Sequence, residues 1–427
     1  MLSLQMIREQ TDAVRAGLKR RGEAPPIDEI LRLDERRRAL LVEIETLRAR
    51  RNDVSRDVGR MKTASAEAVD AVRGEMRQVG ATITNLEGEI ADVETQLQAL
   101  VLEIPNIPDA SVPDGTSEDD NVVIGHWGTP KVFDHPPRPH WELGTALNIL
   151  DFERGVKLSG TRFYLLRGAG AALQRGLIQW LLDLHTREHG YVEINVPYML
   201  KREQLVSAAQ LPRFADNLYH DDQSDLWFIP TAEAALANIY AGEILDAAAL
   251  PKKMVAYTAC FRREQTASGK DTRGIKRGHQ FDKVEMFQIV EPGTDLDVLE
   301  QMLDDACDCL RGLEIPHRRK LLCTADIAFQ SAKTYDVEAW APGVDEWLEV
   351  SSCSTVREFQ SRRAGLRYRR NGGARPEFPY ELNGSGLGVP RTMIAIMENY
   401  QQPDGSIVVP DVLRPYLGGR EIITVEA

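Results

Sequence analysis

The stretch CFRREQTASGKDTRGIKRGHQFDKVEMFQIV, from Cys260 to Val290, holds the pattern that decides the fold. Residues 254–264 combine β-forming side chains with charges, and residues 279–290 place large side chains at alternate positions, so both segments are predicted to be strands. The loop between them has three glycines and four cations, Lys270, Arg273, Lys276 and Arg277. This composition suits a flap over a polyanion, and it equally fits a solvated hairpin tip.

Charged residues in and beside the two predicted strands argue against a purely structural sheet. Arg262 and Glu264 close the first strand, and Glu285 shares a face of the second with Phe281. Charges are seldom buried in sheets without a partner or a function. The order FRRE…RG…HQFDKVEMF resembles motif 2 of the class II aminoacyl-tRNA synthetases, and most of all that of the seryl-tRNA synthetases. The resemblance extends over essentially the whole chain, and it implies an α+β fold with an antiparallel sheet flanked by helices.

Composition limits the class of protein independently of this resemblance. A chain of 427 residues with 43% hydrophobic content is large enough for two domains, and a net charge of −13 argues against indiscriminate polyanion binding. The five cysteines show no CxxC spacing, so they are predicted to be reduced core thiols. The chain shows neither a signal peptide nor an apolar run of the ~20 residues that a membrane span needs. We therefore expect a cytoplasmic enzyme or adaptor with no membrane partner.

Residues 1–104 are predicted to form an N-terminal tRNA-binding domain around two long helices. From Ile27 to Ile104 apolar residues alternate at spacings of three and four on either side of a break at KTASAE, which predicts an antiparallel coiled-coil arm of roughly 50 Å. Arg37 and Arg51 interrupt this seam, so part of it is expected to serve something other than helix pairing. A dimerisation strut would explain the pattern equally well. If the arm binds tRNA, the candidate contacts on its basic first helix are Arg36, Arg38, Arg48, Arg50, Arg56 and Arg60.

The segment 105–128 is rich in proline and carries an acidic run, so it is predicted to be a linker. The resemblance implies that residues 129–427 form a class II catalytic domain with motifs 1 to 3. Motif 1 is matched by a predicted helix from Ala171 to His189 and a strand that follows Gly190 and ends at Pro197. In the family this motif forms the homodimer interface, although an ordinary helix-to-strand connection has the same pattern.

The amino-acid pocket is assigned from two further segments. Thr231 and Glu233 lie where a strand-like WFIP run precedes a predicted helix, a position that a helix cap would also explain. The segment LNGSGLGVPRTMIAIMENYQ is predicted to be a glycine-rich turn before a helix that starts near Pro390, and it matches motif 3. The residues that the resemblance implies for L-serine are Thr231, Ala232, Glu233, Glu285, Asn383 and Ser385.

The nucleotide site combines motifs 2 and 3 with the segment EVSS, residues 349–352. A carboxylate beside hydroxyls at a predicted strand end suits Mg²⁺ held together with phosphates, and the resemblance assigns Glu349 and Ser352 to the Mg²⁺ that accompanies ATP. Arg391 lies in the first turn of a helix, where a cation opposes the dipole but suits a phosphate contact. The resemblance implies that Arg262, Arg391 and Glu349 are catalytic. The full set that it implies for ATP is Arg262, Arg263, Glu264, Gly278, Phe281, Glu349, Val350, Ser351, Ser352 and Arg391.

Two of these residues depart from the family pattern. Arg263 replaces a small residue, and Gly278 replaces an apolar residue near the nucleotide, which puts adenine affinity rather than the fold in question. The resemblance implies a serine–tRNA ligase, which forms seryl-adenylate from L-serine and ATP and transfers serine to tRNA(Ser). The sequence leaves open whether tRNA(Sec) is also a substrate.

Two alternatives from other functional classes remain at this point. One is an enzyme that delivers serine to a small molecule or carrier protein, for which the long arm gives no reason. The other is a non-catalytic RNA-binding or coiled-coil adaptor, against which Arg262, Glu285 and Arg391 argue. Serine-dependent ATP–pyrophosphate exchange, measured with and without tRNA, separates all three possibilities.

Overall fold

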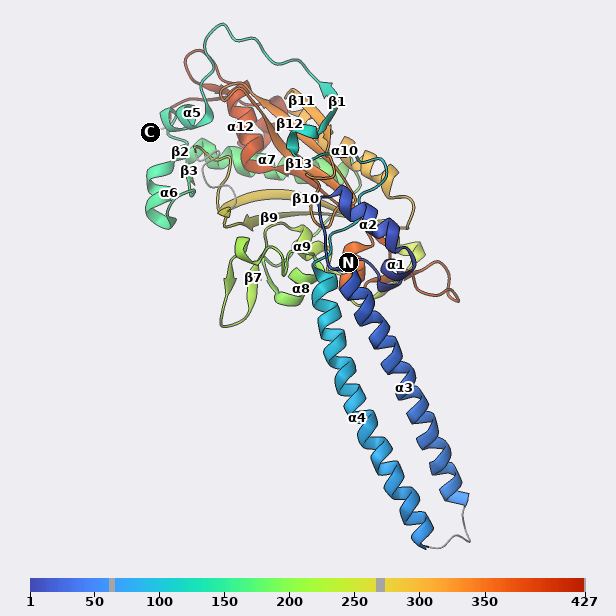
Figure 1. The fold of residues 1–427 in the computed structure, drawn as a ribbon. Helices are drawn as coiled ribbons and strands as arrows, with labels where there is room; N and C mark the ends of the chain where they lie inside the picture. Colours follow the sequence, from blue (N-terminus) through green and yellow to red (C-terminus); the bar gives the residue numbers. More distant parts are fainter. Residues whose placement is uncertain (61–65, 266–272, 426–427) are drawn as a thin grey trace. The chain divides into compact units, whose positions relative to one another are not determined.

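A computed structural model describes residues 1–60, 66–265 and 273–425 (Figure 1). The chain divides into two compact units. The smaller comprises residues 2–19 and 23–104, and the larger comprises residue 1, residues 20–22 and residues 105–427. The segment 105–128, predicted to be a linker, belongs to the larger unit, because its β-forming run VVIGHW is the strand β1 (Val122–Trp127), which pairs with β11 (His317–Leu321).

The smaller unit is a helical hairpin with two short helices. The helices are α1 (Leu4–Glu9), α2 (Thr11–Arg20), α3 (Ile27–Arg60) and α4 (Ala66–Leu102). Helices α3 and α4 have 34 and 37 residues, so each is ~51 to 56 Å long. The seam between them buries apolar side chains from both helices, Leu40, Ile44, Val79, Ile83 and Leu86. The predicted antiparallel coiled-coil arm is thereby confirmed.

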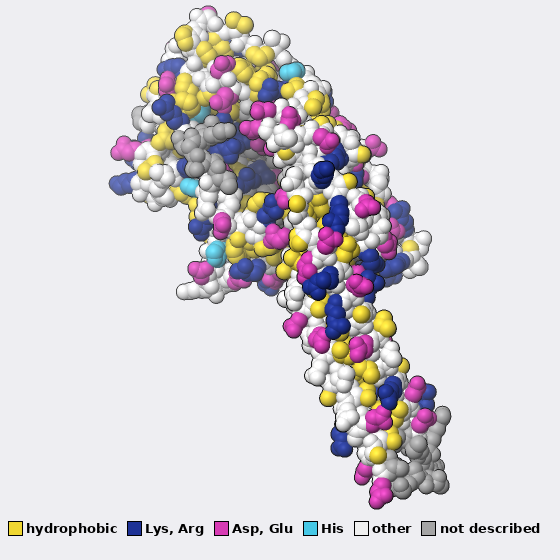
Figure 2. Space-filling model, viewed as in Figure 1, with side chains coloured by type: hydrophobic (Ala, Val, Ile, Leu, Met, Phe, Trp, Pro, Cys, Tyr) yellow, Lys and Arg dark blue, Asp and Glu magenta, His cyan; other side chains and the backbone are white. Residues whose placement is uncertain are grey.

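Ion pairs across the arm account for the different charges of its two helices. Arg37 takes part in helix pairing, because its Nε lies 2.8 Å from Oε1 of Glu94 on α4. Arg51 is exposed rather than buried in the seam. Three further arginines of α3 face glutamates of α4 in the pairs Arg36–Glu89, Arg48–Glu87 and Arg50–Glu75. Figure 2 shows the two signs of charge interspersed along the arm. Exposed pairs of this kind contribute ~0 to 1 kcal/mol each.

The larger unit is built on an eight-stranded sheet in its described residues, with the order β1-β11-β12-β13-β15-β10-β9-β4. All neighbours pair antiparallel except β4 and β9. The remaining strands are β12 (Lys333–Ala341), β13 (Glu346–Arg357), β15 (Tyr380–Gly388), β10 (Gln280–Val290), β9 (Lys252–Phe261) and β4 (Val192–Glu193). The two strands predicted around the central loop are thus confirmed, although β9 ends at Phe261 rather than Glu264. This sheet with its flanking helices confirms the predicted fold class.

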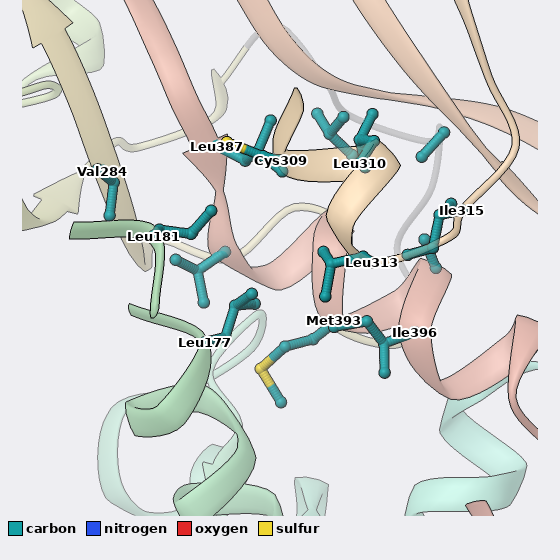
Figure 3. Packing of buried hydrophobic residues seen from close by; sticks show 14 of the residues in the cluster. Leu177, Leu181, Val284, Cys309, Leu310, Leu313, Ile315, Leu387, Met393 and Ile396 are labelled. Atoms are coloured by element: carbon teal, nitrogen blue, oxygen red, sulfur yellow. The ribbon is translucent and has the colours of Figure 1, made fainter. Parts of the chain in front are cut away.

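Three helices pack their apolar faces against the sheet and form the main core, namely α7 (Gly168–Arg187), α10 (Asp295–Gly312) and α12 (Val389–Asn399). Figure 3 shows Leu177 and Leu181 of α7 and Met393 of α12 among the side chains of this core. A second cluster buries Phe287 and Ile289 of β10 together with Leu236 of α9 (Glu233–Leu236). The helices that complete the unit are α5 (His140–Ala146), α6 (Phe152–Ser159), α8 (Arg202–Ser207) and α11 (Phe359–Ala364).

Short strands and 3₁₀ turns connect these layers. The small sheets pair β2 (Leu150–Asp151) with β3 (Leu165–Leu166), β8 (Ile244–Asp246) with β14 (Arg367–Arg369), β16 (Ile407–Val408) with β17 (Ile422–Ile423), and β5 (Met199–Lys201) and β6 (His220–Asp221) with β7 (Leu226–Phe228). The 3₁₀ turns are η1 (Glu118–Asp120), η2 (Ala215–Asn217), η3 (Ala247–Ala249) and η5 (Asp411–Leu417).

Three local predictions differ from the structure. The glycine-rich stretch before α12 is not a turn but the strand β15, in which glycine is needed for space: a Cβ on Gly386 would lie 2.3 Å from His185 Nε2. The strand predicted to follow Gly190 shrinks to the two residues of β4, because only this stretch pairs with β9. The residues 349–352 lie within β13 rather than at its end.

Two predictions from composition can be compared with the described residues. All five cysteines are free and buried, as expected for core thiols. In the described ranges, none of the helices combines the length and the apolar character that crossing a bilayer requires.

Candidate active site

One pocket of about 490 Å³ brings together most of the predicted site residues. Its walls come from three strands of the large sheet, β10, β13 and β15, from the segment that follows β9, and from the starts of α9 and α12. The predicted residues that line it are Thr231, Glu233, Arg262, Glu264, Gly278, Phe281, Glu349, Val350, Ser352, Asn383, Ser385 and Arg391. The sheet explains this convergence, because β10 and β15 are paired with Glu285 opposite Ser385 and Phe287 opposite Asn383.

Four predicted residues lie outside the lining. Ala232 and Glu285 are fully buried, although Glu285 reaches the pocket through Asn383, whose Nδ2 lies 3.4 Å from its Oε1. Ser351 is buried and donates to the carbonyl oxygen of Ser385 at 2.6 Å, which fixes the backbone beside the pocket. Arg263 donates to the carbonyl oxygen of Leu218 at 2.9 Å. Its guanidinium group lies over the ring of Tyr219, 4.8 Å from the centroid.

Some of the predicted positions cannot be placed in this way. The side chain of Arg60 and the whole of Lys270, with the rest of residues 266–272 of the central loop, fall outside the described residues. The other candidate tRNA contacts are on α3 in the smaller unit. Of these, Arg38 pairs with Asp34, and Arg56 lies 3.5 Å from Asp53.

The acidic end of the pocket is organised around Thr231 and Glu233. The Thr231 hydroxyl accepts from the backbone N–H of Glu233 at 3.3 Å, which is the local bond that a helix cap would make. It also accepts from Lys283 Nζ at 2.7 Å, a contact that a cap does not need. The Glu233 carboxylate accepts from Gln360 Nε2 at 2.6 Å and from Asn383 Nδ2 at 3.3 Å. Burial, and next the Glu285 carboxylate, raise the pKa of Glu233 above its usual value. This end is suited to receive an ammonium group.

The opposite end of the pocket is basic and aromatic. The Arg262 guanidinium lies over the ring of Phe281, 5.0 Å from its centroid. Glu264 adopts a positive φ of 49° and places its Oε2 3.4 Å from Arg277. Gly278 is buried, and a Cβ there would lie 3.0 Å from the carbonyl oxygen of Gln280. An aromatic face beside cations is suited to a purine with phosphates.

Arg391 and Glu349, which both line the pocket, form an ion pair. Arg391 Nη1 lies 3.0 Å from Glu349 Oε2 and 2.8 Å from the Glu349 carbonyl oxygen. Partial removal from water opposes ionisation of Glu349, but the Arg391 guanidinium outweighs this, so the pKa of Glu349 lies below its usual value. Burial, followed by the Glu349 carboxylate, raises the pKa of Asp336 on the neighbouring strand well above its usual value.

The oxygen atoms around Glu349 are better suited to bind Mg²⁺ than to bind a metal that prefers sulfur or nitrogen ligands. Glu349 and Ser352 offer hard oxygens to the pocket, and Asp336 Oδ1, opposite Ser352 on β12, is buried without a hydrogen-bond partner among the described residues. No group of three or more His, Cys, Asp or Glu side chains in the described ranges is arranged to hold a metal by itself. A divalent cation here would therefore share its coordination with phosphate oxygens.

Sequence reasoning missed three polar residues at the acidic end. Lys283 has the same strand parity as Phe281 and Glu285, so alternation along β10 was a signal that it faces the pocket. Gln330 lines the pocket, and Gln360 contacts Glu233 from α11. Neither glutamine stands in a pattern that would have predicted its position.

Comparison with known proteins agrees with this geometry along the whole chain. The family model of the seryl-tRNA synthetase N-terminal domain matches residues 1–108, and that of the tRNA synthetase class II core domain (G, H, P, S and T) matches residues 215–400. A serine–tRNA ligase of Roseiflexus sp. strain RS-1 is 56% identical over 424 residues, with 99% of each chain covered. The chain belongs to the seryl-tRNA synthetase family.

Other members of the seryl-tRNA synthetase family agree with this assignment. A serine–tRNA ligase of Chloroflexus aurantiacus is 57% identical and covers 99% of this chain and 100% of its own. The crystal structure of seryl-tRNA synthetase from Pyrococcus horikoshii complexed with ATP has a TM-score of 0.94 at 35% identity, with 100% of both chains covered. As a seryl-tRNA synthetase family member, the chain is an aminoacyl-tRNA ligase, which excludes the non-catalytic adaptor.

Proposed function

We propose that this pocket activates L-serine with ATP and then transfers it to tRNA(Ser). The observation that carries the proposal is the arrangement of the pocket, in which a buried acidic end and an arginine-rich end share one cavity. The acidic end, with Glu233 and Glu285, suits the ammonium and hydroxyl groups of serine. The other end, with Arg262, Phe281 and Arg391, suits ATP. The serine carboxylate would then lie between them, next to the α-phosphate.

The first step is an in-line displacement. A carboxylate oxygen of serine attacks the α-phosphorus, a P–O bond forms, and the bond to pyrophosphate breaks. Neither a protein nucleophile nor a proton transfer is needed, so the chain contributes by positioning the reactants and by preorganised charge. Arg262 and Arg391 are placed to neutralise charge that builds up on the phosphates. Phe281 is placed to stack on adenine, with Glu264 near its amino group.

Glu349 and Ser352 are the residues proposed to hold Mg²⁺. When bound, the ion supplies charge neutralisation and polarises the phosphates. Arg391 has to change partner for this, because it is ion-paired with Glu349 in the structure. We infer that bound phosphates would take the Arg391 guanidinium, so that the Glu349 carboxylate would be free to hold the ion.

In the second step, a ribose hydroxyl at the tRNA 3′ end attacks the carbonyl carbon of seryl-adenylate. An ester bond forms, the mixed anhydride breaks, and AMP leaves with the proton passing to solvent or phosphate. We propose that the arm formed by α3 and α4, within the domain 1–104, binds the tRNA. A-form RNA offers shape and backbone rather than base edges in its major groove, so arginines on α3 would act chiefly through phosphates.

We also propose that the enzyme is a homodimer that uses α7 and β4. The support is the position of β4 at the edge of the large sheet, where Val192 is 62% exposed. An edge strand that is open on one side can pair with a second copy.

Serine-dependent ATP–pyrophosphate exchange, followed by aminoacylation of tRNA(Ser), tests the proposed function. Exchange with serine but not with alanine, together with charging of tRNA(Ser), is the expected result. Exchange without charging, or charging of a carrier protein or small molecule instead, would contradict it. The same charging assay with tRNA(Sec) tests the second acceptor.

A further inference from the structure

Lys283 is a buried lysine that has no role in the proposed mechanism. It lies on β10 between the pocket residues Phe281 and Glu285 in the strand alternation, and only 8% of it is exposed. Burying an ammonium group is costly unless its donors are satisfied. Two partners are present: Nζ donates to Thr231 Oγ1 at 2.7 Å and forms a close ion pair with Glu285 Oε2. Both partners belong to the proposed serine site.

The contacts of Thr231 determine the direction of its hydroxyl. A hydroxyl group has one donor and two acceptor sites. Both acceptor sites of Thr231 are in use, one by Lys283 Nζ at 2.7 Å and one by the Glu233 backbone N–H at 3.3 Å. The hydroxyl hydrogen is therefore the group that Thr231 has left to offer. Because Thr231 lines the pocket, it presents a donor to whatever binds there.

Glu285 has the opposite polarity. Its carboxylate is in contact with the Lys283 ammonium and with Asn383 Nδ2 at 3.4 Å, both of which donate. A carboxylate held between two donors acts as an acceptor. Lys283 thus contacts one group that donates into the pocket and one group that accepts.

We propose that Lys283 is a positioning residue that sets the hydrogen-bond polarity of the amino-acid pocket. It fixes Thr231 as a donor toward the substrate's side-chain hydroxyl, and it holds Glu285 as an acceptor that reaches the pocket through Asn383, whose Nδ2 lies 3.4 Å from Glu285 Oε1. Because Asn383 donates through Nδ2 to Glu285, its Oδ1, which has no hydrogen-bond partner among the described residues, is left as the acceptor in the pocket. A serine hydroxyl both donates and accepts, so it satisfies Thr231 and this acceptor at once. Alanine satisfies neither and would leave buried polar groups unpaired, the situation in which an enzyme discriminates most strongly. This inference rests on the proposed function.

The test compares serine with alanine rather than measuring activity alone. Exchange kcat/KM is measured for both amino acids in the parent, Lys283→Met and the control Lys333→Met. Lys333 is also 8% exposed and lies in the same sheet, but it does not line the pocket. Lys283→Met is expected to lower the serine-to-alanine ratio by about 10- to 100-fold, whereas Lys333→Met is expected to leave it unchanged. An equal loss with both amino acids would overturn the proposal.

Two Thr231 variants keep the proposal testable if Lys283→Met does not fold. Thr231→Ser retains the hydroxyl and is expected to keep the ratio within a few-fold of the parent, whereas Thr231→Val should lower it as Lys283→Met does. The double variant should lose little more than Lys283→Met alone, because Thr231 is one of the two groups that Lys283 orients. A normal ratio in Thr231→Val, or additive losses, would overturn the inference. A parent without serine-dependent exchange would instead contradict the proposed function itself.

Discussion

Arg391 occupies a position that is poor for helix stability, and its guanidinium contacts the carboxylate of Glu349. Arg391→Ala is expected to lower the rate of ATP–pyrophosphate exchange by roughly 10²- to 10³-fold, the usual scale for losing one preorganised charge. The matched control is Arg370→Ala, which removes an exposed arginine paired with Glu377 outside the pocket. Exchange by Arg391→Ala within a few-fold of the parent would show that Arg391 serves only its ion pair.

The buried carboxyl of Glu233 makes serine binding dependent on pH. Burial and the nearby Glu285 raise its pKa above 4.5, so the protonated form persists to a higher pH than in an ordinary glutamate. Since the substrate ammonium needs the carboxylate, kcat/KM for serine should fall as pH decreases through this raised pKa. Glu233→Gln should lower kcat/KM and abolish its decrease at low pH. If kcat/KM of Glu233→Gln still decreased over the same pH range, the decrease would be due to another titrating group.

The raised pKa of Glu233 also makes the free energy of unfolding depend on pH. Folding favours the protonated form of Glu233, so its contribution to the free energy of unfolding is greatest below pH 4.5 and declines as pH rises through the folded-state pKa. Glu233→Gln cannot ionise, so its melting temperature relative to the parent should rise over that interval.

At the scale of the element, the arm can be shortened without disturbing its base. Replacing residues 45–88 by a short loop keeps Leu40 and the Arg37–Glu94 pair, which hold the base together. Serine-dependent exchange should be unchanged, because the pocket residues all lie between 210 and 391. Aminoacylation should collapse, since an arm of ~51 to 56 Å is proposed to reach RNA far from the 3′ end. Parental charging by the shortened enzyme would exclude tRNA binding by the arm.

Ion pairing on the arm competes with any phosphate contact. Arg48 and Arg50 are paired with Glu87 and Glu75, so neutralising the glutamates should free both arginines. The double variant Glu75→Gln, Glu87→Gln is expected to bind tRNA a few-fold more tightly and with a steeper dependence on salt. Arg48→Gln should have the opposite effect. Weaker binding by the glutamine variant would mean that the pairs hold the arm in its binding shape.

The elements that the sequence predicted best are those with long, regular patterns. The heptads from Ile30 to Ile104 predicted α3 and α4 because apolar residues of the seam, among them Leu40 of α3 and Ile83 of α4, pack in one cluster. The prediction failed where pairing depended on distant strands. The segment 122–127 becomes an edge strand only because β11 is available, and Gly384 lies in a strand because β15 pairs with β10 on one side and with β13 on the other.

The site was predicted to a similar degree, and for related reasons. Residues within local motifs, such as Arg262, Glu349 and Arg391, could be named from sequence and do line the pocket. Gln330 and Gln360 could not, because only the fold carries them to Glu233 from elsewhere in the chain.

At the scale of the whole molecule, the proposed homodimer gives a measurable prediction. Val192 is 62% exposed on the edge strand β4. Val192→Lys should weaken self-association, because it places a charge where an apolar edge is proposed to pair. Sedimentation velocity at micromolar concentration should show a shift from dimer towards monomer. Ile422→Lys, which also removes an exposed apolar side chain, should leave the association state unchanged. A monomeric parent would contradict the proposal outright.

The alternation along β15 also limits how the enzyme can be redesigned. Asn383 and Ser385 line the pocket, whereas a Cβ on Gly384 or Gly386 would lie within 3 Å of side-chain atoms on α10, β13 or α7. A mutant library aimed at a different amino acid should therefore diversify 383 and 385 and keep both glycines. Two of these four adjacent codons then need no sampling, which leaves more of the screen for combinations that can fold.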